Sequence, residues 1–284
     1  MREQALGERP IADHRVVDAT INYLEKGVYD SVWYSSESWR SKMPLEPQLM
    51  KIEDMTDRRD ECTLDREGFA LIHAPTKVTD FRDPAQIRDI YLKELELAVM
   101  AATGAKKVIV QGGGVVRLNE RSPEFGLKGT TYPGRYAHCD YSDESGPAIA
   151  RNALKPEEAE AWMRGRFMII NTWRALSPPP LDAPLAVCDA RTCGPNDHVI
   201  SQVVLGPPGG PGMRMQTNMV VHNPTHRWCY FRGMTRDDLL LFRGYDSDAA
   251  HHSRTPHTAF DDPSAEEGVP RESIDIRAIA YFGT

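Results

Sequence analysis

The stretch Tyr136-Ala137-His138-Cys139-Asp140-Tyr141 decides how the rest of the chain is interpreted. Side chains two residues apart in a β-strand point to the same face, so His138 and Asp140 can meet one metal ion. A second histidine would complete a 2-His-1-carboxylate triad, which holds non-haem Fe(II) and leaves positions open for a co-substrate and O2. The H-x-D pattern is also common at strand ends that make ordinary hydrogen bonds, so the remaining chain has to decide between the two.

Short apolar segments bounded by turn residues surround this stretch. The expected strands are residues 68–73, 107–111, 115–118, 166–174, 184–189, 227–231, 239–242 and 273–282. Helical periodicity is confined to residues 84–103, which Asp83 should cap, and to residues 155–166. Many short strands and few helices predict a mainly β fold, a double-sheet jelly roll or cupin-like barrel that these helices buttress.

Three consecutive glycines, Gly112-Gly113-Gly114, separate two of these strands. A glycine-rich loop after a strand can bind a nucleotide. The segment lacks both the G-x-G-x-x-G pattern and the P-loop lysine, and no helix start follows it. We therefore expect a β-bulge or a close approach of two backbones.

Composition excludes several classes of partner. The chain has 284 residues and a formal net charge of -7, with no block of basic residues, so neither nucleic acid nor a membrane surface is expected as a partner. The amino-terminal residues lack a signal-peptide pattern, and no apolar run is long enough to span a membrane. The cysteines are odd in number and scattered, which favours free thiols in a reducing, cytoplasmic setting. They are Cys62, Cys139, Cys188, Cys193 and Cys229.

Residues 1–60 are expected to form an N-terminal arm, and residues 61–284 the barrel domain. The arm carries Trp33, Tyr34 and Trp39 among serines and charged residues. Exposed aromatic residues of this kind are enriched in interfaces, so we expect a homodimer in which the arm helps to cover the partner. The alternative is that the rings pack on their own barrel.

The third metal ligand has to come from a later strand, and His257 is the best candidate. It lies in Thr255-Pro256-His257-Thr258, shortly before the final strand. A neighbouring strand can bring it to the same end of the sheet as the H-x-D pair. His252 is the rival, but it lies in a polar loop.

An R-x-S pattern, Arg271 and Ser273, opens the final strand and places both side chains on one face. A guanidinium pairs bidentately with a carboxylate, and a hydroxyl adds one hydrogen bond. Together they suit the distal carboxylate of 2-oxoglutarate. Arg277 projects to the same face and is the substitute. The alternative is a surface arginine paired with Glu272 or Asp275.

These motifs resemble the fungal hydroxylase/desaturase family, related to the small chain of the bacterial cephalosporin 7α-methoxylase. The similar segments are His138-Cys-Asp140, Phe167 to Arg174, Pro184 to Arg191, Phe242 to Ser247, Thr255 to Pro263 and Pro270 to Ser273. The resemblance implies a double-stranded β-helix that uses Fe(II), 2-oxoglutarate and O2 on a small-molecule intermediate of secondary metabolism, such as a terpenoid or polyketide. It also implies that His138, Asp140 and His257 bind the metal and that Arg271 and Ser273 bind the co-substrate.

Two further residues of these motifs are candidates for the co-substrate site. Arg174 could reach 2-oxoglutarate or form a structural ion pair, and Tyr230 could donate to its carboxylate or lie in the core. Asp189 and Arg191 are expected to pair structurally. A non-catalytic subunit that completes a partner oxygenase stays an alternative, as does a cupin isomerase that uses no 2-oxoglutarate.

Overall fold

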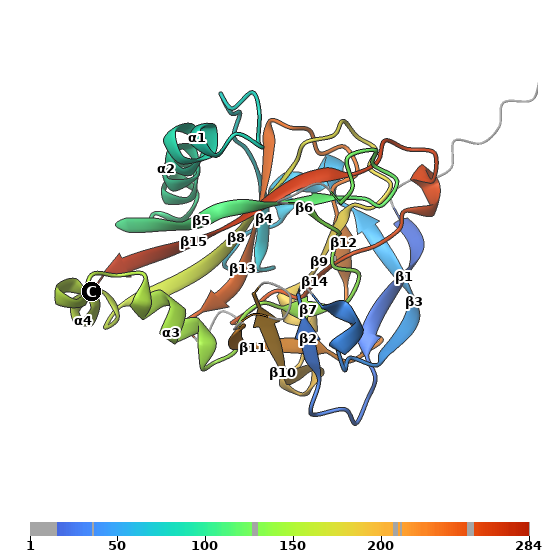
Figure 1. Cartoon of the computed structure of the whole chain (residues 1–284), viewed down its shortest axis with the longest axis horizontal. Helices are drawn as coiled ribbons and strands as arrows, with labels where there is room; N and C mark the ends of the chain where they lie inside the picture. The colour runs from blue at the N-terminus through green and yellow to red at the C-terminus, as the bar shows by residue number, and fades with distance from the viewer. Residues whose placement is uncertain are drawn as a thin grey trace, which may run out of the picture.

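The computed structural model describes residues 16–35, 37–126, 130–206, 210, 212–248 and 253–283. Two sheets pack face to face, one of nine strands in the order β1-β3-β12-β9-β14-β7-β11-β10-β2 and one of six in the order β4-β13-β8-β15-β5-β6 (Figure 1). This architecture confirms the expected mainly β, jelly-roll fold. No helix in the described ranges is long and apolar enough to cross a membrane.

The larger sheet takes strands from almost the whole chain. These are β1 (Val16–Leu24), β2 (Val32–Tyr34), β3 (Leu45–Asp54), β7 (His138–Cys139), β9 (Leu185–Cys188), β10 (His198–Leu205), β11 (Met213–Val220), β12 (Trp228–Tyr230) and β14 (His257–Ala259). The smaller sheet contains β4 (Phe69–His73), β5 (Lys107–Leu118), β6 (Thr130–Thr131), β8 (Arg166–Ala175), β13 (Asp238–Asp246) and β15 (Glu272–Gly283).

Helices lie beside the smaller sheet (Figure 1). They are α1 (Pro84–Gln86), a π-helical turn (Ile87–Tyr91), α2 (Leu92–Thr103), α3 (Ser145–Asn152) and α4 (Pro156–Trp162). Short 3-10 turns occur at Ser38–Arg40, Thr56–Glu61, Ala190–Thr192, Pro195–Asp197 and Pro263–Ala265.

The continuous helical segment 84–103 begins and ends where the sequence predicts. The Asp83 carboxylate accepts a hydrogen bond from the Ala85 amide at 2.8 Å, and Gly104 ends the helix at φ +70°. Leu95 and Val99 pack into a core shared with the smaller sheet. The helix therefore buries the outer face of that sheet and leaves its inner face free to form a site.

The three glycines form the expected bulge. Asp275 of β15 pairs with Val115, whereas Arg277 pairs with Gln111, so three residues of β5 lie between these pairs and only one residue of β15. A Cβ on Gly114, whose φ is +80°, would lie 2.8 Å from the Cδ1 atom of Ile274. The bulge needs glycine both for the left-handed backbone and for the close approach.

The described part of the expected arm belongs to the larger sheet. β1 pairs with β3, and β2 pairs with β10. The Trp33 ring lies 5.7 Å from the Tyr136 ring, so it packs on its own barrel, whereas Trp39 is 75% exposed. The division of the chain at residue 60 stays a prediction.

Replacing Gly114 by alanine should lower the free energy of unfolding by about 1–3 kcal/mol, because the new methyl group meets Ile274 and the backbone keeps a positive φ. Chemical denaturation measures the change. Gly113→Ala is the matched control, since a Cβ there has no neighbour within 4 Å. Equal losses in the two variants would contradict the assignment of the strain to Gly114.

Candidate metal centre and active site

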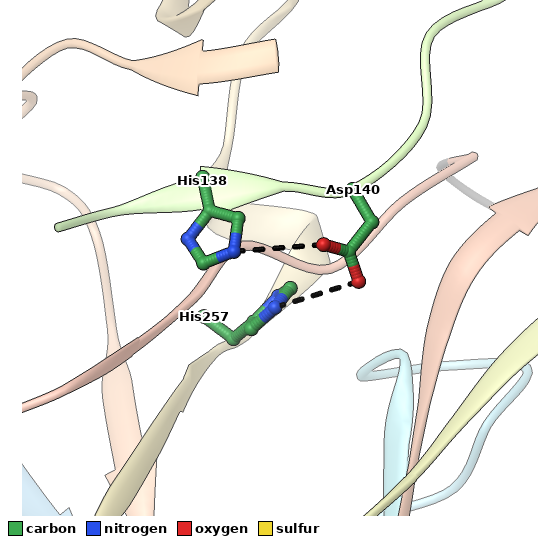
Figure 2. Close-up of side chains that lie close together, drawn as sticks. All are labelled: His138, Asp140 and His257. Carbon is green, nitrogen blue, oxygen red and sulfur yellow. Dashed lines mark ion pairs between the residues drawn. The ribbon is translucent and has the colours of Figure 1, made fainter. Parts of the chain in front are cut away.

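His138, Asp140 and His257 come together at one point of the larger sheet. His138 lies in β7, Asp140 follows that strand directly, and β14 places His257 opposite His138. The Nε2 atom of His138 is 3.6 Å from Oδ1 of Asp140, and Nε2 of His257 is 3.8 Å from Oδ2 (Figure 2). One ligand atom from each of the three residues lies within 4.8 Å of the other two, so together they can hold one metal ion.

Backbone carbonyls orient both imidazoles. Nδ1 of His138 lies 2.9 Å from the Tyr136 carbonyl oxygen, and Nδ1 of His257 lies 3.3 Å from that of Thr255. A carbonyl oxygen can only accept, so each Nδ1 carries the proton and each Nε2 presents a lone pair to the Asp140 carboxylate. Lone pairs that face a carboxylate repel it unless a cation lies between them, so the site fits a metal ion.

The charge states also suit a metal. Burial, with His138 nearby, lowers the pKa of His257 to about 3. Burial alone would raise the pKa of the Asp140 carboxyl, but the positive charge of Arg277 opposes it, and the pKa lies well below its usual range. A neutral imidazole and a carboxylate at neutral pH belong to the donor set that binds Fe(II) in open non-haem sites.

The smaller sheet holds the second oxygen of Asp140. Asn171 of β8 donates from Nδ2 to Oδ2 at 2.6 Å, and Arg277 of β15 donates from Nη2 to the same atom at 3.3 Å. Arg277 also donates to Asp275 at 3.2 Å, and Arg117 donates to the other oxygen of Asp275 at 2.7 Å. Oδ2 is thus occupied by the protein, and Oδ1 faces His138.

The sequence alone did not identify most of these contacts to Asp140. It indicated Arg277 only as a substitute for Arg271, and it did not single out Asn171. One signal was present: Asn171 interrupts the apolar run Phe167-Met-Ile-Ile, and an amide inside a buried strand needs a partner.

Arg271 is buried beside the same site. It is 1% exposed, and it donates from Nε to the Ser273 hydroxyl at 3.0 Å and from Nη1 to the Ala183 carbonyl at 2.9 Å. Its Cζ atom lies 5.1 Å from the centre of the Trp173 ring. Burial, with Arg117 nearby, lowers the pKa of Arg271 to about 9.

Within the described ranges, no carboxylate lies within ion-pair distance of the Arg271 guanidinium. The expected surface alternative is wrong, because Asp275 pairs with Arg117 and Arg277 while Glu272 faces Arg82. A buried cation that lacks a counter-ion is unstable, so a carboxylate that reaches Arg271 would bind there favourably.

A cavity of about 890 Å³ joins these groups. The cavity is also lined by apolar side chains, most of them from β2, β10 and β11, which belong to the same sheet as β7 and β14. Those side chains are Trp33, Leu185, Val203, Leu205, Met213, Met215, Met219 and Phe242. The cavity therefore combines charged groups and the proposed metal ligands with an apolar surface, as small-molecule sites do.

Arg174 and Tyr230 lie outside this cavity, which corrects the prediction that they bind the co-substrate. Alternation along β8 turns Trp173 toward the cavity and Arg174 toward the helices, where it donates to the Tyr91 hydroxyl at 3.0 Å and the Ala74 carbonyl at 2.7 Å. Tyr230 is fully buried, and its hydroxyl lies 3.5 Å from the Asp262 carboxylate.

The remaining candidates are structural or undescribed. Arg191 donates to both carboxylate oxygens of Asp189, as expected for a structural pair. His252, the rival ligand, lies outside the described residues.

Comparisons with known proteins agree with this geometry. Residues 21–281 match the family described as Oxidoreductase/YMDC permease-like domain. The hydroxylase/desaturase CTB9 of Cercospora beticola is 31% identical over 89% of this chain and 82% of its own length. The Fe(II)/2-oxoglutarate-dependent dioxygenase nvfI of Aspergillus novofumigatus is 27% identical over 84% of each chain.

A solved structure of the iron and alpha-ketoglutarate-dependent endoperoxidase NvfI superimposes with a TM-score of 0.80. It covers 98% of this chain and 100% of its own, at 23% identity, and so supports the fold. The chain belongs to this oxidoreductase family of hydroxylase/desaturases and Fe(II)/2-oxoglutarate-dependent dioxygenases. The relation to the cephalosporin 7α-methoxylase small chain stays a prediction.

Replacing Asn171 by alanine should weaken Fe(II) binding by about 10-fold or more, because groups that orient a metal ligand usually contribute that much. Competition with a chelator under anaerobic conditions measures the affinity. Thr172→Val is the matched control, since Thr172 is the next residue of β8 and bonds a backbone carbonyl instead. Equal affinities for Asn171→Ala and the parent protein would contradict the role of Asn171 in orienting Asp140.

Proposed function

We propose that this chain is itself the catalyst and that His138, Asp140 and His257 hold its Fe(II). The observation that carries the proposal is the convergence on one cavity of this cluster and the Arg271 guanidinium, which has no carboxylate partner among the described residues. With 2-oxoglutarate bound beside it, the iron would supply the O2-dependent oxidation that gives hydroxylation, desaturation or rearrangement. The protein's own groups bind, orient and shield the reactants.

Arg271 and Ser273 are the proposed clamp for the distal carboxylate of 2-oxoglutarate. Ser273 is fully buried and holds Nε of Arg271, which fixes the guanidinium plane against the Trp173 ring. Nη2 is then available to a ligand, since no acceptor in the described ranges bonds it. A charge-assisted bond to a buried guanidinium gives both affinity and direction.

The proposed substrate is a small apolar intermediate of secondary metabolism, such as a terpenoid or polyketide. Trp33, Met213 and Met215 line the wall of the cavity that would receive it. Methionine side chains adapt to irregular apolar shapes, which suits a polycyclic skeleton. The cavity volume lies within the range of drug-sized ligand sites.

Two alternatives predict different chemistry. A non-catalytic subunit would need neither the metal cluster nor the buried Arg271, and both are present. A cupin isomerase would need the metal but no carboxylate at Arg271. Succinate formation from 2-oxoglutarate by the isolated chain separates the three functions.

We also propose that the protein works as a cytoplasmic homodimer. The five cysteines are free thiols, as a reducing compartment favours. Tyr29, Trp39 and Leu49 are each more than 70% exposed, and apolar side chains of this size are typical of interface cores.

Replacing His257 by alanine should lower the iron affinity by more than about 100-fold, because it removes a direct ligand and orienting groups alone contribute up to about 100-fold. Iron stoichiometry after gel filtration and succinate formation are the two measurements. His73→Ala and His252→Ala should leave both unchanged. Full iron content and turnover in His257→Ala would reject it as a ligand.

Replacing Arg271 by alanine should raise the half-saturating 2-oxoglutarate concentration by roughly 30-fold, which corresponds to about 2 kcal/mol for a lost charge-assisted pair. Ser273→Ala should give a smaller increase, since it removes only the support of Nε. Iron affinity should change little in both variants. If Arg271→Ala leaves half-saturation unchanged and Arg277→Ala raises it, the clamp is Arg277.

The dimer predicts a sedimentation mass near twice 31.9 kDa at micromolar protein concentration. Trp39→Ser should shift the equilibrium toward monomer, because it removes an exposed ring from the proposed interface. Leu97→Ser, an exposed residue on α2 beside the smaller sheet, is the control. A full-length protein that sediments as a monomer would contradict the homodimer.

A further inference from the structure

Two thiols lie against each other at the end of β9. The Sγ atoms of Cys188 and Cys193 are 3.4 Å apart, although no disulfide joins them. A disulfide requires about 2.0 Å between the sulfurs, so closure needs a movement of roughly 1.4 Å. All five cysteines lie in the described ranges, and no other two of their sulfurs are in contact.

The two thiols differ in access to solvent. Cys188 is fully buried between its strand neighbours, whereas Cys193 is partly exposed. Burial and the neighbouring Cys193 raise the pKa of the Cys188 thiol well above its ordinary value. A dissolved oxidant therefore meets Cys193 first, and Cys188 lies behind it in position to react next.

The fold decides which partner moves. The Cys188 amide donates to the Pro256 carbonyl at 2.8 Å, and Cys188 pairs with Trp228 on the other edge of β9. Cys193 follows the short 3-10 turn Ala190–Thr192, and its amide makes a longer bond of 3.3 Å to the Ala190 carbonyl. Closure is therefore carried by Cys193, while β9 stays in place.

We propose that Cys188 and Cys193 form a peroxide-reactive thiol pair that closes reversibly to an intrachain disulfide. The Cys193 sulfur attacks hydrogen peroxide, which breaks the O–O bond and gives a sulfenic acid and one water. The Cys188 sulfur then displaces the hydroxyl group, its proton leaves with that group as a second water, and the S–S bond forms. The two thiols lose two electrons, which reduce one peroxide.

This site is separate from the metal centre. Neither cysteine lines the cavity, and the proposal does not depend on iron or 2-oxoglutarate binding. It nevertheless adjoins the strand pair that positions the proposed metal ligand, since Val187, the residue before Cys188, is the β-partner of His257. Oxidation at this place would tie the 3-10 turn to the strand next to β14.

The test uses the full-length, reduced protein treated with hydrogen peroxide in small molar excess and then alkylated with N-ethylmaleimide. Before alkylation we expect an intact mass lower by two hydrogens. After alkylation under denaturing conditions we expect two fewer alkylated thiols than in the untreated protein, and digestion should give a linked peptide pair containing Cys188 and Cys193. Dithiothreitol should restore both thiols. Recovery of Cys193 as a sulfinic acid without a crosslink, or of both thiols unchanged, would overturn the proposal.

Single variants test the order of reaction. Cys193→Ser should abolish the disulfide, and because Cys193 is partly exposed this variant should keep the parent melting temperature. Cys188→Ser should accumulate a sulfenic acid on Cys193, which dimedone traps. Cys229→Ser, at another buried cysteine, should leave the crosslink unchanged. A crosslink that persists in Cys193→Ser, or that requires Cys229, would reject the pair.

Discussion

The second oxygen of Asp140 is the point on which the site depends. All three proposed metal ligands belong to the larger sheet or follow one of its strands, but Asn171 and Arg277 reach this oxygen from the smaller sheet. A carboxylate held in this way presents its other oxygen, Oδ1, to the His138 imidazole. The relative position of the two sheets is therefore transmitted directly to the metal centre.

The strand β15 and the residue directly before it supply most of the charged side chains that line the cavity. Arg271, Asp275 and Arg277 point into the cavity, whereas Ile274 and Ile276 point into the core under α2. Asp275 lies between two arginines and balances one of them, and Asp140 balances part of the other. Arg271 has no carboxylate partner among the described residues. The charges of Asp275 and Arg277 are therefore paired within the protein, whereas Arg271 can bind an external anion.

Sequence periodicity and chemistry determined the local parts of this arrangement. The two-residue spacing of His138 and Asp140, and of Arg271 and Ser273, placed each pair on one face because alternation in a strand is a local property. The helix at 84–103 and the glycine bulge were predictable for the same reason, since the Asp83 cap and the left-handed glycines act within a few residues.

The tertiary structure decided what depends on long-range neighbours. The sequence assigned Arg174 to the co-substrate site because it does not show which face of β8 the helical segment covers. It assigned Tyr230 there because it does not show that this side chain is buried in the core. The role of Asn171 at Asp140 depends on contact between two sheets, which no local pattern encodes. The same holds for Cys188 and Cys193, whose five-residue spacing permits contact but does not require it. The sequence by itself determined which side chains share a strand face, because backbone geometry is local, and only packing of the sheets decided which faces meet.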